Sequence, residues 1–208
     1  MKRYLILIYL GCICFSIVNG QVLGLKGGLS FAQGKYVIYE VESSSGSLFG
    51  INTGILGEVP VSDALSLGTG VSFIKKGLKT EVFDLPVRYI EFPVNLTYRI
   101  DFTSWNLYAQ AGPYAAVGIS AKKKSNITDK IKFGSLASEY KRMDYGINLG
   151  GGFEINNLQI GVNYGFGFIN ISHAYREVIR NRVFTVSAVY YIDDIGYAFS
   201  NLWDWIFG

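Results

Sequence analysis

The chain has 208 residues, of which half are hydrophobic and 17% are charged, a balance that excludes a disordered, coiled-coil or collagen-like protein. Its formal net charge of +3 is too small to indicate a nucleic-acid partner. With 25 glycines, 15 tyrosines and 14 phenylalanines but 4 prolines, the composition favours an all-β protein.

Residues 1–20 have the pattern of an export signal. A short positive start precedes an uncharged, mostly apolar run, 4–18, and small residues suit cleavage before Gln21. As a helix this run would span about 22 Å, less than the ~30 Å hydrocarbon core, so a membrane anchor is the weaker interpretation. A lipoprotein site at Cys12 is a second alternative. Cleavage would remove Cys12 and Cys14, and with them every thiol and disulfide.

The rest of the chain alternates with period two. Between 89 and 100 the even-numbered positions are apolar, apart from the tyrosine ring of Tyr98, whereas the odd-numbered positions include Glu91 and Arg99. Such alternation over ten or more residues is typical of a strand. It predicts eight long strands, at about 22–33, 47–59, 64–76, 86–100, 105–121, 139–153, 158–171 and 181–192.

The predicted connections alternate in length. Short connections at 60–63, 101–104 and 154–157 interleave with long ones at about 34–46, 77–85, 122–138 and 172–180. An even number of long antiparallel strands with this alternation is typical of a transmembrane barrel with short periplasmic turns and longer extracellular loops. The sequence therefore predicts an all-β fold for residues 21–192: an eight-stranded antiparallel transmembrane β-barrel in the outer membrane of a Gram-negative bacterium.

The second face of the strands is rich in glycine, which weakens a strand on a solvated surface but suits a narrow lumen filled by side chains. A soluble periplasmic lipocalin-like barrel is the alternative, with the apolar face inside. If the small face points inward, its sparse charges must pair, and losing Glu91 or Arg142 should be costly. The predicted lumen charge network consists of Lys26, Glu58, Glu91, Arg99, Arg142 and Asp144.

Five segments, taken in order, form a recognisable pattern: GLKGGLS at 24–30, YIEFPV at 89–94, LYAQAGPY at 107–114, DYG at 144–146 followed by GGGF at 150–153, and NRVF at 181–184. In these segments the chain resembles the Bacteroidetes porin-like outer-membrane β-barrel family, the PorT-like group. The resemblance implies a fold and a membrane but no chemistry. A few members of that group serve secretion or gliding machinery, so envelope or secretion-machinery proteins are expected partners.

No catalytic, cofactor or metal site is predicted. Ser172 precedes His173, the single histidine, but adjacent strand residues point to opposite faces and cannot pair there. One histidine and no cysteine after residue 20 exclude a His/Cys metal cluster. The glycine clusters lie in strands and are not followed by the helix and Lys-Ser/Thr of a phosphate loop.

The third long loop with its flanks, 122–142, carries seven basic and two acidic residues. Lysine and arginine contact phosphates readily, so lipopolysaccharide or another polyanion is an expected partner, and a merely solvated loop is the alternative. The residues expected to make this contact are Lys122, Lys123, Lys124, Lys130 and Lys132.

Residues 193–208 form a separate tail. Ile195, Phe199, Leu202 and Ile206 recur at helical spacing, which predicts a short amphipathic helix at the membrane interface. Alternating aromatic residues leave a ninth strand as the alternative.

The expected function is a structural or interaction role in the outer membrane, without catalysis and without a cofactor. A narrow solute channel and an outer-membrane lipid-modifying enzyme are the alternatives. Eight strands with a filled lumen disfavour the channel, and the missing nucleophile–base pair disfavours the enzyme.

Overall fold

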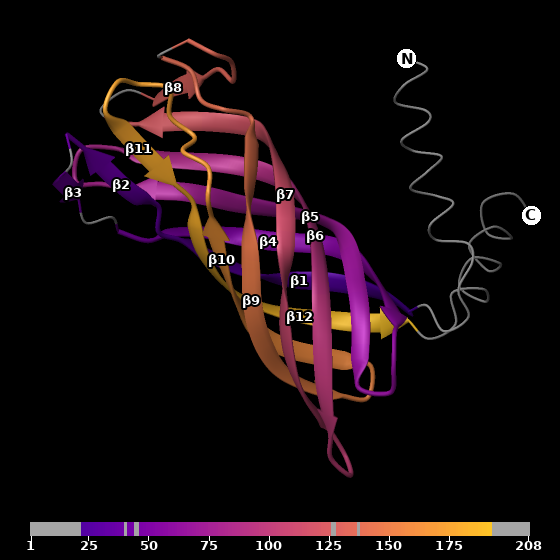
Figure 1. The fold of residues 1–208 in the computed structure, drawn as a ribbon. Helices are drawn as coiled ribbons and strands as arrows, with labels where there is room; N and C mark the ends of the chain where they lie inside the picture. The colour runs from indigo at the N-terminus through magenta and orange to yellow at the C-terminus, as the bar shows by residue number, and fades with distance from the viewer. Residues whose placement is uncertain (1–21, 40, 44–45, 126–127, 137, 193–208) are drawn as a thin grey trace, which may run out of the picture.

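The computed structural model describes residues 22–39, 41–43, 46–125, 128–136 and 138–192 (Figure 1). The predicted export signal and C-terminal tail lie outside these residues. The described residues include no helix long and apolar enough to cross a membrane. Their long strands are β1 (Val22–Ala32), β4 (Leu48–Pro60), β5 (Leu65–Lys79), β6 (Asp84–Asp101), β7 (Asn106–Lys124), β9 (Met143–Ile155), β10 (Leu158–Gly167) and β12 (Arg182–Ile192).

The long strands close into a barrel. Each pairs antiparallel with the next along the chain, and β1 pairs with β12 from Leu23↔Ile192 to Ala32↔Val183. Closure leaves the wall without an unpaired edge, so the backbone hydrogen bonds are satisfied within the sheet, as a lipid environment requires. The prediction of a closed eight-stranded antiparallel barrel is confirmed.

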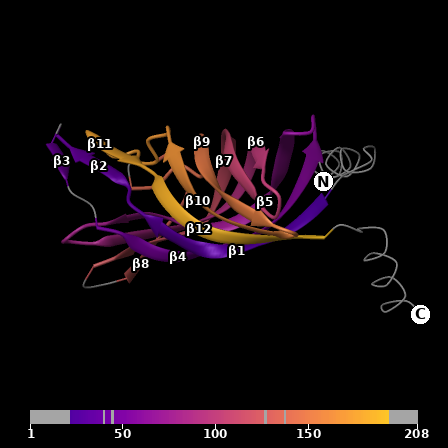
Figure 2. The ribbon, with the colours of Figure 1, turned by 90° about the horizontal axis from the view of Figure 1, so that it is seen from below.

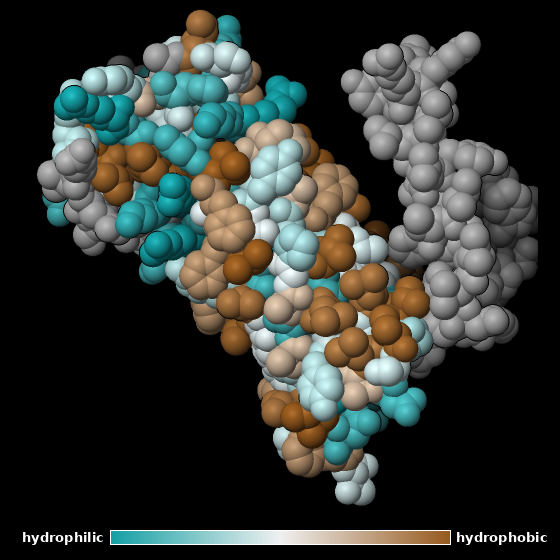
Figure 3. All heavy atoms as spheres, in the orientation of Figure 1, coloured by the Kyte–Doolittle hydropathy of each residue, from teal (hydrophilic) through white to brown (hydrophobic). Residues whose placement is uncertain are grey.

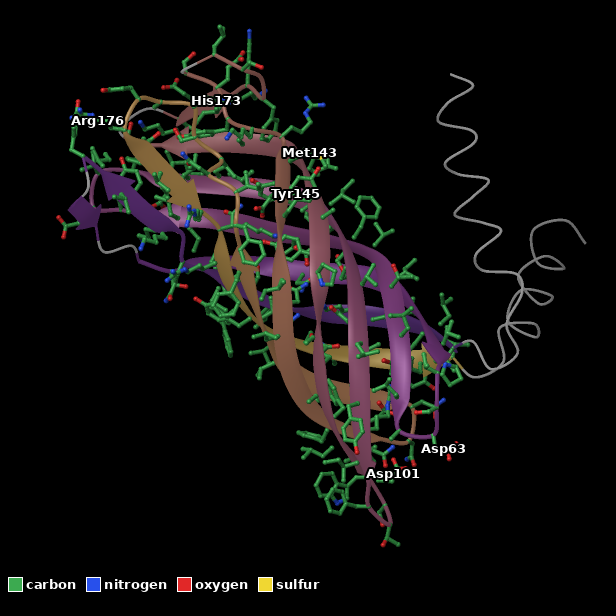
Figure 4. The ribbon with its side chains drawn as sticks, viewed as in Figure 1. Asp63, Asp101, Met143, Tyr145, His173 and Arg176 are labelled. Carbon is green, nitrogen blue, oxygen red and sulfur yellow. The ribbon has the colours of Figure 1, made fainter. Side chains whose placement is uncertain are left out.

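The two ends of the barrel differ. The turn end has Val22, Ile192 and the connections 61–64, 102–105 and 156–157. The opposite end, called the loop end, has the connections before β4 and β6 and the longer ones after β7 and β10. Figure 4 shows Asp63 and Asp101 at the turn end and His173 and Arg176 at the loop end.

The loop end contains short strands that periodicity did not predict. In the described residues these are β2 (Lys35–Ile38), β3 (Val41–Ser43), β8 (Thr128–Ile131) and β11 (Glu177–Arg180). Strand β8 extends β7 into a hairpin, whereas β11, β2 and β3 form a small separate sheet beyond the barrel (Figures 1 and 2). Each has three or four residues, too few to show a period in the sequence.

The predicted long loop at 77–85 is wrong. Strands β5 and β6 continue to Lys79 and Asp84, and the turn between them is closed by a hydrogen bond from Thr80 N to Phe83 O of 2.8 Å. Alternation fails here because Gly77 has a φ of +121° and adjacent lysines precede it.

A β-bulge shifts the side-chain alternation of β7. Tyr89 pairs with Gly118 but Arg88 pairs with Ser120, so Ile119 is an additional residue. Beyond it Ala121 is buried, and Ser120 lies opposite the exposed Arg88.

Apolar side chains cover the outside of the wall. In β6, Val94 is 42% exposed and Glu91 is 7% exposed, so the apolar face points outward and the polar face inward. Figure 3 shows hydrophobic residues over the wall and hydrophilic ones gathered at the loop end. This is the reverse of a soluble lipocalin-like barrel, and an apolar outer face over a polar lumen is typical of a transmembrane barrel.

Candidate functional site

A charged cluster fills the lumen on the loop side. The Nζ atom of Lys76 on β5 lies 2.7 Å from Glu91 Oε2 on β6 and 3.1 Å from Asp144 Oδ2 on β9. The side chains of Lys76 and Asp144 are 2% and 0% exposed. One buried ammonium group therefore bridges two carboxylates from different strands. We call Lys76, Glu91 and Asp144 the loop-side cluster.

Neutral polar groups complete the loop-side cluster. Tyr114 Oη and Asn181 Nδ2 donate to Asp144 Oδ2 over 3.2 and 3.0 Å. Asn148 Nδ2 donates to Glu91 Oε1 over 3.4 Å. The Lys76 ammonium also lies 3.8 Å from the centroid of the Tyr114 ring, within cation–π range. Buried charges need such partners to offset the loss of hydration.

A second cluster lies near the turn end. Arg99 Nη1 lies 2.5 Å from Glu58 Oε1, and Arg99 Nε lies 3.2 Å from Glu154 Oε2. The Ser66 hydroxyl and Tyr191 Oη donate to the Glu58 carboxylate. We call Arg99, Glu58 and Glu154 the turn-side cluster. It bridges β4, β6 and β9 across the lumen, as the loop-side cluster bridges β5, β6 and β9.

Packed apolar residues close the loop end beyond the loop-side cluster. Ile171, after β10, and Ile179, on β11, are fully buried, and Ile171 N donates to Ile179 O over 2.9 Å. They belong to one buried hydrophobic cluster with residues from the outer ends of the barrel strands. Its other members include Ala32, Tyr36, Leu48, Leu78, Leu85 and Val87.

Between the two clusters the lumen is polar. Lys26 on β1 and Asn163 on β10 line both the cavity on the turn side and the smaller cavity on the loop side. Lys26 makes no ion pair with any residue that the structure describes. It therefore differs from Lys76 and Arg99, whose charges are matched by direct contacts.

A basic surface lies at the loop end, on the β7–β8 hairpin. Lys122 pairs with Lys130 and Lys123 with Asp129 across the two strands. The ammonium of Lys123 lies 4.4 Å from the centroid of the Phe83 ring. Lys123, Lys124, Lys130 and Lys132 are exposed and Lys122 is half-buried, so the structure places four of the five predicted residues on the hairpin and Lys132 directly after it.

Comparison with known proteins supports the membrane interpretation. The profile of the outer membrane protein beta-barrel domain family matches residues 20–173, more than half of the chain. The chain belongs to this family. The described structure is accordingly that of an outer-membrane barrel from a Gram-negative bacterium. No curated protein matches its sequence significantly.

Three solved structures among those that match this chain are bacterial proteins. Ail of Yersinia pestis is 14% identical, with a TM-score of 0.47 over 84% of this chain and 100% of Ail. Neisserial surface protein A is 12% identical, with a TM-score of 0.48 over 83% of this chain and 97% of that protein. The N-terminal barrel domain of Pseudomonas aeruginosa OprF is 9% identical, with a TM-score of 0.41 over 84% of this chain and 98% of that domain.

The sequence predicted one network of six lumen charges, but the structure does not bring all six together. Glu91 and Asp144 lie in the loop-side cluster, Glu58 and Arg99 lie in the turn-side cluster, and Lys26 lies between them. Arg142 was expected on the same face, and this is wrong. It precedes β9 and is exposed, with its guanidinium carbon 5.5 Å from the Phe133 ring centroid.

Two members of these clusters, Lys76 and Glu154, were missed. Lys76 follows Ser72 and Ile74 at two-residue spacing along β5, and both of these residues face inward. This spacing could have identified Lys76 as an inward-facing residue from the sequence. Glu154 was assigned to a turn, but β9 continues through it to Ile155.

Replacing Arg99 by methionine is expected to lower the free energy of unfolding by about 1–3 kcal/mol, because Glu58 and Glu154 then lose their shared donor. The cluster is partly hydrated, with the Arg99 side chain 16% exposed, which limits the loss. Urea unfolding in detergent micelles measures it. Asp63→Asn, an exposed change in the turn-end connection 61–64, should leave the transition in place. Equal transitions for both variants would contradict the role of Arg99.

Ser172 and His173, weighed in the sequence as a catalytic pair, lie at the loop end just after β10. The Ser172 hydroxyl donates to the carboxylate of Glu177, not to His173. Nearby, burial and the carboxylate of Glu177 raise the pKa of the Tyr36 phenol on β2 above its usual value. Among the described residues no three His, Cys, Asp or Glu side chains lie close enough to hold a metal ion.

Proposed function

We propose that this protein is a non-conducting, non-catalytic barrel that acts through its loop end, as an interaction platform accessory to secretion or surface assembly. The observation that carries the proposal is the filled lumen. The loop-side cluster, the turn-side cluster and the apolar residues around Ile171 and Ile179 occupy it in successive layers.

A solute channel is the less favoured function. An eight-stranded barrel has an interior just wide enough for side chains, and open aqueous pores use about 16 strands. Here Lys76 and Arg99 each tie strands together across the interior. Conduction would require these contacts to break, leaving charges unpaired in a narrow space.

The proposal includes an orientation and an export route. Short turns of bacterial barrels face the periplasm and long loops face outward, so the basic β7–β8 hairpin faces the lipopolysaccharide layer. Residues 1–20 act as the export signal, with cleavage before Gln21. Lipopolysaccharide and envelope or secretion-machinery proteins are the proposed partners.

We also propose that the chain is a PorT-like barrel of the Bacteroidetes type. The five resembling segments lie on β1, β6, β7, β9 and at the start of β12. They supply Glu91, Tyr114, Asp144 and Asn181 of the loop-side contacts, and also Lys26. The resemblance therefore involves residues that fill one part of the lumen, and not surface features alone.

Planar bilayers test the proposed function. The purified barrel is expected to give no steady single-channel current under conditions in which a sixteen-stranded porin, added as a control, conducts. The same preparation, incubated with lipopolysaccharide, should release no fatty acid. A steady current, or acyl-chain release that Ser172→Ala abolishes, would overturn the non-conducting or the non-catalytic part respectively.

A further inference from the structure

A groove runs between the β7–β8 hairpin and four residues that follow it, Lys132, Phe133, Glu139 and Arg142. Its lining includes four cations, Lys122, Lys130, Lys132 and Arg142, but one acidic residue, Glu139. It lies outside the lumen and is separate from both charged clusters. The groove therefore gathers four cations at the point where the barrel wall gives way to the loop end.

The single carboxylate of Glu139 offsets the four positive charges of the groove only in part. Lys122 and Lys130 lie directly opposite each other in the hairpin, an arrangement of like charges that destabilises a strand pair. Glu139 Oε2 already accepts a hydrogen bond from Leu136 N over 3.0 Å. None of the four cations forms an ion pair with a residue of the described chain. A bound anion would relieve this repulsion.

Backbone hydrogen bonds anchor the chain at two of the four basic residues, Arg142 and Lys132. Gly118 N donates to Arg142 O over 2.7 Å, and Tyr140 N donates to Lys132 O over 3.1 Å. The Arg142 guanidinium also lies over the Phe133 ring. The groove is thus formed by segments tied to the barrel rather than by a free loop, and a ligand need not order it first.

An exposed apolar track continues from the groove down the wall. Ile119 lines the groove and is 48% exposed. On the neighbouring strand Met143 and Tyr145 are exposed and pair with Val117 and Ala115 of β7. Figure 4 shows Met143 and Tyr145 one below the other on β9, next to the loop end. A ligand with a phosphate in the groove could lay a hydrocarbon chain along this track.

We propose that the groove binds a phosphate group of an anionic outer-leaflet lipid, with the headgroup among the four cations and an acyl chain against Ile119, Met143 and Tyr145. Lysine offers a compact charge and arginine a planar fork that matches two phosphate oxygens. The apolar track favours a lipid over a soluble polyanion. This inference rests on the proposed orientation, with the loop end at the outer leaflet.

Titration of the folded full-length barrel in zwitterionic detergent tests the groove. Phosphorylated lipopolysaccharide is expected to bind saturably, lipopolysaccharide treated with phosphatase about tenfold more weakly, and inorganic phosphate without saturation at millimolar concentration. The double variant K130Q/R142Q should weaken binding of the phosphorylated lipid by on the order of tenfold. Both side chains are exposed, so the barrel should fold normally.

The charge-matched control is R176Q/R180Q, which removes two exposed arginines from the β10–β12 side of the same end. It should retain the wild-type affinity. Equal weakening in both double variants would indicate a diffuse charge effect and overturn the groove. Equal affinity for phosphorylated and phosphatase-treated lipopolysaccharide would also overturn the groove. Saturable binding of inorganic phosphate would show that the groove takes free phosphate, and would overturn the proposal that its ligand is a lipid.

The lipid-binding test and the conductance test of the proposed function can fail independently. A conducting barrel that still binds lipid through Lys130 and Arg142 would overturn the proposed function and leave the groove intact. A barrel that gives no channel current and shows no phosphate-dependent lipid binding would overturn the proposed lipid site alone.

Discussion

Replacing Lys76 by methionine is expected to lower the free energy of unfolding by about 3–5 kcal/mol. The ammonium group lies within 2.7 Å of Glu91 and 3.1 Å of Asp144, and its loss leaves two carboxylates facing each other in the interior. Methionine has nearly the length of the lysine stem, so the change removes charge more than volume. The shift of the heat-modifiable band in gels and urea unfolding in micelles both measure the loss.

The neighbouring lysine is the matched control. Lys75 is half-buried, its Nζ donates to the backbone carbonyl of Phe49, and it forms no ion pair with a described residue, so Lys75→Met should cost about 1 kcal/mol or less. The combined variant K76M/E91Q/D144N should be more stable than K76M, because neutral amides replace the unpaired charges. Equal losses for Lys76→Met and Lys75→Met, or no rescue by the amides, would contradict the role of the cluster.

The sequence also led to an expectation that Arg142→Leu would be as costly as a change at Glu91. The structure reverses this for Arg142, which is exposed and outside the lumen. A substitution there should affect the groove and not the stability of the barrel.

Replacing Gly77 by alanine is expected to destabilise the barrel by about 2–4 kcal/mol. Gly77 has a φ of +121°, a conformation that side-chain-bearing residues rarely adopt. A Cβ atom at this position would lie 1.8 Å from the carbonyl oxygen of Leu85 on the paired strand. Because that atom belongs to the backbone, the two strands must separate near the loop end to admit the methyl group.

Gly27→Ala provides the control for a glycine in a barrel strand. A Cβ atom at Gly27 would meet nothing within 4 Å, since this residue points out of the wall. Its unfolding transition in urea should coincide with that of the wild type or lie slightly higher, whereas Gly77→Ala should unfold earlier. Coincident transitions for the two variants would show that the chain near Gly77 adapts without strain.

For the basic hairpin, the sequence predicted the cluster of lysines but not the groove that they line. The lysines of 122–132 could be assigned to one loop because they are neighbours in sequence. That Lys122 faces Lys130, and that Arg142 joins them in a groove beside Ile119, depends on a bulge in β7 and on the short strand β8. Neither has a period long enough to be recognised in the sequence.

The sequence by itself determined the barrel. Two-residue alternation from β1 to β12 fixes which side chains share a face, and the alternating connection lengths fix an antiparallel order, because both are properties of neighbouring residues. Only the tertiary structure decided the charge partners. Lys76 and Asp144 are 68 positions apart and Glu58 and Tyr191 are 133 apart, and they meet because closure and register bring distant strands to one level of the lumen. Alternation gives each residue a side of the wall but not a height along the barrel, so it could name Glu91 and Arg99 as inward charges without separating them into two clusters.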